Sequence, residues 1–171
     1  HGDGALKMFN MYRDLNPRIY VFEIVDSFVS HLQKRFHNNK AVRIFDFGLG
    51  DEDKTIEFSI CSIATSIFTK PAGSEMESGK IRNVVRFLEK NSIKKIDLLK
   101  MNIEGGEYEL LDKLITSGVV KSCIKIQIQF HNYGEWSVLK RNELKEELRK
   151  THFCTYDFEW TFENWQLKET L

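Results

Sequence analysis

Residues 96–111, IDLLKMNIEGGEYELL, place a lysine, an amide and several carboxylates within and just after an apolar run. A strand that is buried on both faces is usually a continuous run of apolar residues, so Lys100 is unfavourable there without a partner. Because side chains alternate along a strand, Lys100 and Asn102 share one face, and Glu104 joins them if the strand geometry persists. We therefore predict that Lys100 is held by a carboxylate, with Glu104 and Asp46 as candidates.

The turn after this run contains two glycines followed by acids. Gly105 and Gly106 allow the backbone to turn tightly and a ligand to approach it closely. Glu107 and Glu109 fall in the first turn of the next predicted helix, where the helix dipole favours acids. We interpret these two as ordinary helix N-terminal acids, so the functional hypothesis for this stretch rests on the lysine, the amide and the first glutamate.

The elements that must position these groups alternate between β-rich runs and helical patterns. Strands are predicted at 18–23, 41–51 (ending in a glycine turn), 54–63, 95–103 and 123–131, helices at 26–38, 80–91, 106–118 and 138–151, a loop at 69–79, and two closing strands at 154–162 and 165–169. This alternation predicts an α/β fold: a mostly parallel twisted sheet with helices on both faces and a C-terminal antiparallel hairpin. The 171 residues fit a single domain over 1–171.

Composition narrows the class of protein. Twenty-five basic residues balance 25 acidic ones, which gives no overall electrostatic case for binding nucleic acid. The apolar runs are strand-sized, so no membrane span is expected, and nothing at the start resembles a signal peptide. Cys61, Cys123 and Cys154 are odd in number and widely spaced, which favours reduced thiols in a cytoplasmic protein over a disulfide framework or a zinc site. No metal site is predicted.

Chemistry-bearing residues end several of the predicted strands. In open α/β sheets, ligands bind at the carboxyl ends of the strands. Those ends carry Glu23, then Asp46 and Phe47, then Asn102 and Glu104, and finally His131. An acid such as Glu23 can accept both ribose hydroxyls of NAD or of S-adenosylmethionine. The alternative for Glu23 is a solvated acid that caps the following helix.

These residues carry a resemblance to a known family. The stretch 96–111 resembles the signature of the FkbM methyltransferases, roughly D-L-L-K-x-D-x-E-G-x-E-x-x-x-L, and matches it at Asp97, Leu98, Leu99, Lys100, Glu104, Gly105, Glu107 and Leu111. Three other stretches are similar to the family: IYVFEIVDSFVSHLQ (19–33), DFGLGDEDKTIEFSI (46–60) and IQIQFH (126–131). The resemblance runs from the first residues to about Trp165.

The resemblance implies a Rossmann-like class I fold and S-adenosylmethionine as the methyl donor. It also implies O-methylation of a hydroxyl on a sugar, a glycan or a secondary metabolite. It assigns Glu23 to the ribose, Asp46 to the adenine with Phe47 beside it, and Gly2 to the end of the loop that cradles the methionine part. The small-molecule or glycan acceptor and the oligomeric state are not indicated by the sequence.

Three departures from the family pattern matter. The family's Asp in the central motif is Asn102 here, and its acid before Phe-His is Gln129; each keeps hydrogen-bonding capacity but loses a carboxylate, so a metal or general-base role is not expected at either. The family's first strand and glycine loop are not found within residues 1–171. We expect the native chain to continue upstream with that strand, because a sheet without it would leave two open edges.

The mechanism that the resemblance implies is direct methyl transfer to an oxygen, with help in removing the hydroxyl proton. His131 is the first candidate for the base, because its ordinary pKa lies near working pH, and Glu104 is the second. Lys100 and Asn102 would position the acceptor or those acids. The alternative for His131 is a hydrogen-bonded histidine that closes a strand. Tyr133 and Trp136 either stack on a sugar ring or cover the core.

Two other functions stay open from the sequence. A catalytically inactive Rossmann domain that binds a nucleotide or a partner is suggested by the two lost carboxylates at Asn102 and Gln129. An NAD-dependent oxidoreductase would also suit Glu23, but nothing in the central motif favours it. Binding of S-adenosylhomocysteine or of NADH distinguishes these classes.

Overall fold

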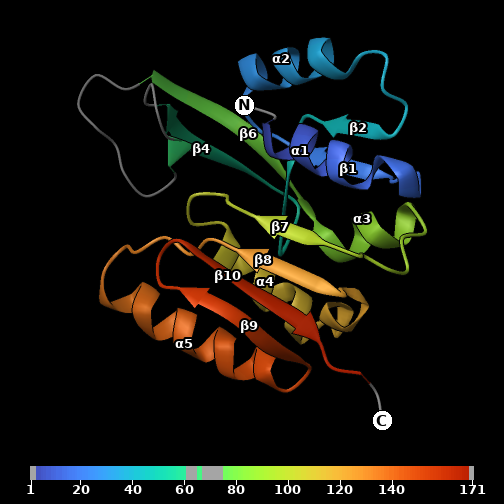
Figure 1. Cartoon of the computed structure of the whole chain (residues 1–171). Helices are drawn as coiled ribbons and strands as arrows, with labels where there is room; N and C mark the ends of the chain where they lie inside the picture. The colour runs from blue at the N-terminus through green and yellow to red at the C-terminus, as the bar shows by residue number, and fades with distance from the viewer. Residues whose placement is uncertain (1–2, 61–64, 67–74, 170–171) are drawn as a thin grey trace.

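The computed structural model describes residues 3–60, 65–66 and 75–169, so Gly2 and Cys61 lie outside the described residues (Figure 1). The first half contains α1 (Asp3–Tyr12), the 3-10 helix η1 (Arg13–Leu15), β1 (Ile19–Phe22), α2 (Asp26–Phe36), β2 (Val42–Phe45), β3 (Gly48–Gly50), β4 (Lys54–Ile60), β5 (Thr65–Ser66) and β6 (Glu75–Asn83). The second half contains α3 (Val84–Lys90), β7 (Leu99–Met101), α4 (Glu107–Thr116), η2 (Val119–Ser122), β8 (Lys125–Ile128), α5 (Glu135–Arg149), β9 (His152–Phe158) and β10 (Phe162–Leu167).

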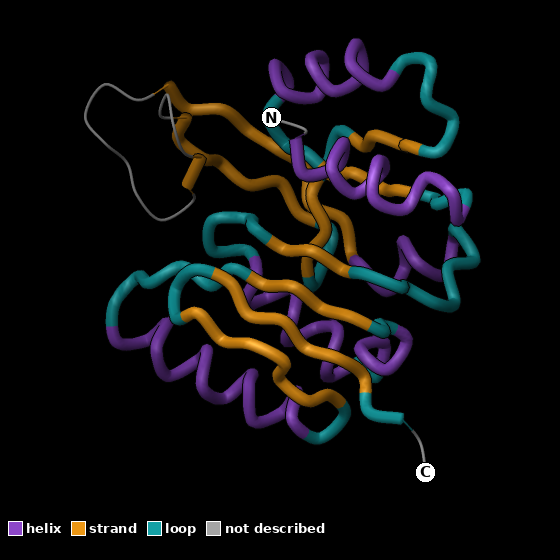
Figure 2. Tube along the Cα trace, viewed as in Figure 1, coloured by secondary structure: helices purple, strands orange, loops and turns teal. Residues whose placement is uncertain are grey.

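The strands of the described residues form three separate sheets, two of them mixed, so the prediction of one mostly parallel sheet is not confirmed. A two-stranded parallel sheet pairs β1 with β2, a four-stranded mixed sheet has the order β7-β8-β10-β9, and another has the order β3-β6-β4-β5. The pairs β1–β2, β3–β6 and β7–β8 are parallel, whereas the pairs of β10 with β8 and β9, and of β4 with β5 and β6, are antiparallel. The α/β class and the C-terminal hairpin agree with the prediction (Figure 2).

The strand β6 explains much of this difference. Residues 75–79 were predicted to be loop and 80–83 to begin a helix, yet β6 spans Glu75–Asn83 and pairs with β4. The helix α3 starts only at Val84, because Asn83 caps it: its side-chain oxygen accepts the Arg86 N–H at 3.0 Å. The rest of the predicted loop, 69–74, lies outside the described residues. Gly48–Gly50, predicted as a turn, pairs with β6 as the strand β3.

Within the described part of the chain, β1 and β7 are among the edge strands, which have a strand partner on one side only. There, β1 pairs with β2 alone and β7 pairs with β8 alone, so each leaves one backbone edge without a strand partner. Open edges of this kind were expected for a sheet that lacks the family's first strand. The upstream strand itself stays a prediction.

The main core lies where α3, α4 and α5 pack on the strands. Met101, Ile126, Ile128 and Trp165 from the sheet are almost fully buried, and they join Leu111, Leu114, Leu144 and Leu148 from α4 and α5. The other face of this sheet carries residues such as Phe162 and Asn164, which are only partly buried. A smaller core of Leu32, Phe36 and Val42 joins α2 to β2. In the residues that the structure describes, no helix is long and apolar enough to cross a membrane.

Buried charges tie α5 to the terminal hairpin. The Arg141 guanidinium, with 6% of its side chain exposed, lies 2.6 Å from the Glu163 carboxylate, which is 2% exposed. The Trp165 indole N–H donates to the same carboxylate at 3.0 Å. Arg141 also contacts Asp157 at 2.8 Å and the exposed Glu159 at 3.3 Å. Lys145 on the same helix also contacts Asp157 and lies 3.7 Å from Glu163, so α5 holds the hairpin through an arginine and a lysine.

Replacing Glu163 by Gln is expected to lower the free energy of unfolding by about 3–5 kcal/mol, because it leaves the buried Arg141 charge undercompensated. Glu159→Gln is the matched control: it removes a carboxylate from the same arginine, but its side chain is 68% exposed. Exposed pairs contribute less than about 1 kcal/mol, so the control should change little. Urea denaturation measures both, and equal effects of the two substitutions would contradict the analysis.

Candidate active site

His131 lies between two carboxylates at the end of β8. Its Nε2 is 3.3 Å from Glu104 Oε1, and its Nδ1 is 3.0 Å from Glu107 Oε1. Its side chain is 15% exposed, Glu104 is 35% exposed and Glu107 is fully buried. The parallel register of Met101 with Ile128 brings the ends of β7 and β8 to the same edge, which is why Glu104 and His131 meet. The sequence prediction that these two lie at one rim is therefore matched by the geometry.

Glu107 holds this arrangement together. Its Oε2 accepts the Gly105 N–H at 2.8 Å, and its Oε1 accepts the backbone N–H of His131 at 2.9 Å as well as the ring contact. One carboxylate therefore joins the turn before α4 to the segment after β8. The neighbouring Tyr108 adds a second tie, since its hydroxyl donates to the His131 carbonyl at 2.7 Å. Burial, and next the Glu107 charge, raise the pKa of Tyr108 to about 12, so it stays a neutral donor.

The backbone of the turn aims Glu104 at the histidine. Glu104 has φ of +49°, in the left-handed region that non-glycine residues rarely adopt, and Gly105 follows with φ of +110°. A conformation of this kind costs on the order of 1–3 kcal/mol and persists where surrounding bonds fix it. Here the Glu107 bond to the Gly105 N–H supplies that restraint. Gly105 is thus required for the turn, as the sequence indicated.

The pKa of His131 is raised above its ordinary value of 6.5. Burial acts in the opposite direction, because it disfavours the charged imidazolium. The hydrogen bond and charge of Glu107, with a further contribution from Glu104, outweigh burial. With Nδ1–H directed at Glu107, Nε2 is the nitrogen that takes up and releases a proton on the side of Glu104. The group is a basic imidazole in a fixed orientation.

The prediction that a carboxylate neutralises a buried Lys100 is wrong. Lys100 is exposed, and its ammonium lies 4.7 Å from the centre of the Phe162 ring on the face of the sheet away from α4 and α5. No ion pair joins Lys100 to a carboxylate within the described ranges. The prediction assumed that both faces of β7 are buried. The face that carries Lys100 is not covered by described residues, so a charged side chain there has little desolvation cost. Asn102 is also exposed and lies at the end of the strand.

The predicted cofactor residues gather at the end of the other parallel pair. Phe22 is in register with Phe45, and the Glu23 N–H donates to the Phe45 carbonyl at 3.1 Å, so Glu23 and Asp46 follow the two strands at one edge. Glu23 Oε1 accepts the N–H groups of Ile24 and Val25 at 2.9 and 3.0 Å. The acid therefore organises the start of α2, which begins at Asp26.

Phe47 belongs to a cluster of rings beside this edge. Its ring centre lies 5.8 Å from that of Phe22, 5.4 Å from Phe45 and 5.9 Å from Phe87. Asp46 is exposed next to it. In the described part of the chain, no hydrogen bond or ion pair connects Glu23 or Asp46 with His131. The residues that were predicted to share one rim therefore form two groups. Glu23, Asp46 and Phe47 follow the β1–β2 pair, whereas Glu104 and His131 follow the β7–β8 pair.

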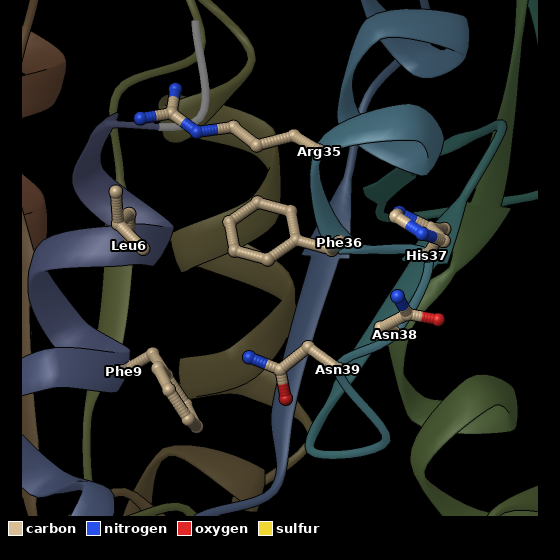
Figure 3. A pocket seen from close by; sticks show the side chains of 7 residues that line it. All are labelled: Leu6, Phe9, Arg35, Phe36, His37, Asn38 and Asn39. Carbon is tan, nitrogen blue, oxygen red and sulfur yellow. The ribbon is translucent and has the colours of Figure 1, made fainter.

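A separate pocket of about 380 Å³ lies between α1 and the end of α2 (Figure 3). It is lined by Leu6, Phe9, Arg35, Phe36, His37, Asn38 and Asn39. The lining offers rings, amides, one imidazole and the Arg35 guanidinium but no carboxylate, and it does not include Glu23, which was predicted to bind the ribose hydroxyls. His37 is engaged with its own helix, with Nδ1 2.9 Å from the Lys34 carbonyl.

Comparison with known proteins agrees with the motif at 96–111. The family model of the methyltransferase FkbM domain matches residues 1–159. The chain belongs to this family. The crystal structure of methyltransferase FkbM from Methylobacillus flagellatus is similar in fold, with a TM-score of 0.50 and 13% sequence identity over 87% of this chain. This chain spans 36% of the length of that one, and no curated protein matches it.

The sequence analysis missed the part played by Glu107. It was interpreted as an ordinary acid at a helix N-terminus, yet it is fully buried and binds His131. The family motif has an acid at the position of Glu107, and this match was the sequence signal that could have revealed its role. Helix-dipole reasoning explains an acid in this turn but not a buried one.

Replacing Glu107 by Gln should lower the pKa of His131, because burial remains while the hydrogen bond to a charged carboxylate is lost. Glu104→Gln should lower the pKa less, since Glu104 is farther away and partly exposed. NMR titration of the His131 ring protons measures both. A larger effect from Glu104 would show that the wrong carboxylate has been identified as the main partner.

Proposed function

We propose that this protein transfers a methyl group from S-adenosylmethionine to a hydroxyl of a sugar, a glycan or a secondary metabolite. The observation that carries the proposal is the His131 imidazole, held by a buried carboxylate on one nitrogen and facing a partly exposed carboxylate on the other. A base of this kind is what transfer to a hydroxyl needs, because the oxygen must lose its proton as it attacks.

The residues after β1 and β2 suit the methyl donor. Glu23 presents a half-buried carboxylate whose Oε1 is fixed by two backbone N–H groups, which leaves Oε2 to accept ribose hydroxyls. Asp46 follows β2 at the same edge, and Phe47 contributes an aromatic surface beside it for the adenine. When bound, S-adenosylmethionine supplies an electrophilic methyl group on a positively charged sulfur.

The role of the chain in the reaction is then to orient the acceptor and accept its proton. His131 Nε2 would take the proton of the acceptor hydroxyl, whose oxygen would receive the methyl group that bound S-adenosylmethionine supplies. Glu107 keeps Nδ1 protonated and stabilises the imidazolium that results. Glu104 and the exposed Asn102 would contact the acceptor near the base. Lys100 has no role in the proton step, since its ammonium lies over Phe162.

The direct test is calorimetric titration of S-adenosylhomocysteine into the protein, with NADH as control. Micromolar binding of the former alone, together with transfer of label from radioactive S-adenosylmethionine to a hydroxylated acceptor, would support the proposal. Binding without transfer to any acceptor would favour the inactive domain instead. Binding of NADH alone would refute methyl transfer.

Two matched substitutions separate the proposed roles. Glu23→Gln keeps an acceptor for the backbone N–H groups but loses the charge, and hydrogen bonds to charged groups contribute about 1.5–3 kcal/mol. We expect the Kd for S-adenosylhomocysteine to rise about tenfold or more. Glu104→Gln should leave this Kd unchanged and reduce kcat. Unimpaired binding and turnover in both variants would contradict the site.

The pH dependence of turnover follows from the raised pKa of His131. The neutral imidazole is the active base, so kcat/KM should rise with pH through a pKa above 6.5. In Glu107→Gln the midpoint should move to lower pH. A pH profile of kcat/KM in both proteins measures this, and an unmoved midpoint would show that another group is the base.

A further inference from the structure

A second pocket lies beside the candidate active site. It has a volume of about 340 Å³, at the small end of the range of about 300–1,000 Å³ that ligand sites occupy. Residues from the β3–β4 turn, from α4 and from the start of α5 line it: Asp51, Tyr108, Glu109, Asp112, Trp136 and Lys140. The proposed transfer reaction uses none of these side chains directly.

An aromatic surface forms one part of the pocket. Trp136 is 44% exposed, which is unusual for a residue of this size. Its indole stacks on Tyr133 with an interplanar angle of 6° and packs against Tyr108, with ring centres 5.1 Å apart. Contacts with Tyr133 and Tyr108 hold the ring in place while part of it faces solvent. The sequence left two alternatives for Trp136, a ring that covers the core and a ring that stacks on a sugar. The structure shows a ring that is supported by its neighbours and still accessible to solvent, which fits both alternatives.

Charged groups of both signs form the rest of the pocket, and they are paired with each other. Lys54 contacts Asp51 at 3.0 Å and Glu109 at 2.6 Å, and Lys140 contacts Asp112 at 2.8 Å. Asp51 and Glu109 share Lys54, so the three lining carboxylates face only two lysines, and the negative charge that remains disfavours an anionic ligand. The pocket presents strong acceptors next to strong donors, which suits a neutral ligand whose hydroxyls both donate and accept hydrogen bonds.

The pocket is connected to His131 by short, well-fixed contacts. Tyr108 lines the pocket and donates its hydroxyl to the His131 carbonyl. The rings of His131 and Tyr133 are 6.4 Å apart, and those of Tyr133 and Trp136 are 6.3 Å apart. Between them, the buried Ser137 accepts the Tyr133 N–H at 2.8 Å, which fixes this segment. The exposed Trp136 ring therefore lies two ring contacts away from the His131 imidazole.

We propose that this pocket binds a neutral sugar unit of the acceptor, which stacks on Trp136 and hydrogen-bonds to Asp112 and Lys140. This inference rests on the proposed function, because a neighbouring unit of the same glycan then presents its hydroxyl to His131. It narrows the acceptor from any hydroxylated molecule to a glycoside with at least one further sugar.

The test follows tryptophan emission and heat of binding while methyl glycosides of glucose, galactose, mannose and rhamnose, and then maltose and lactose, are added to the protein. Saturable binding of at least one of these sugars is expected. Trp136→Ala should weaken it at least tenfold, Trp136→Phe should retain part of it, and Asp112→Asn should weaken it without removing the ring. Leu139→Ala is the matched control, because Leu139 is 63% exposed on the same helix but does not line the pocket.

No saturable response to any sugar, or a response that Trp136→Ala and Asp112→Asn leave unchanged, would overturn the proposal. Saturable binding of choline in place of the sugars would overturn it too, because it would identify a site for cations. The same preparations are titrated with S-adenosylhomocysteine. Intact cofactor binding without any sugar response removes the sugar subsite alone. Sugar binding without cofactor binding, in this chain and in a chain extended upstream of His1, supports the subsite and refutes methyl transfer.

Discussion

The buried carboxylate of Glu107 is the interaction on which the candidate active site depends. A charge with no access to water is costly unless hydrogen bonds satisfy it, and here two backbone N–H groups and one ring nitrogen do so. These donors come from two segments that are far apart in sequence, the turn after β7 and the residues after β8. Satisfying one side chain therefore brings both segments into a single arrangement and fixes the orientation of His131.

The rest of the second half of the chain is arranged so that this carboxylate can be buried. The β7–β8 register brings the two segments to one edge of the sheet, and the apolar residues of α4 pack in one core with residues of that sheet. The Arg141–Glu163 pair then anchors α5, whose first turn carries Trp136. Site and scaffold are thus joined through buried charge as well as apolar packing, and breaking a buried pair by removing one partner is strongly destabilising.

Much of this arrangement could be predicted from the sequence, and the failures have physical causes. The motif at 96–111 identified the family, and strand-end reasoning selected Glu104 and His131, because both depend on local pattern. The strand β6 was missed because its polar residues and Gly79 resemble a loop, and it is formed by pairing with β4 across the sequence. Lys100 was misplaced because alternation assigns a face but does not say whether anything covers it. Glu107 was undervalued because burial depends on tertiary packing that a helix pattern does not contain.

The one-sided pairing of β1 and β7 has a practical consequence for handling the protein. In the described part of the chain, each of these strands offers a row of backbone N–H and C=O groups along one edge, and such edges pair readily with any extended polypeptide. Each edge is therefore a place where association between copies of the protein can begin through backbone hydrogen bonds. The formal net charge of zero provides no overall repulsion between copies to oppose it.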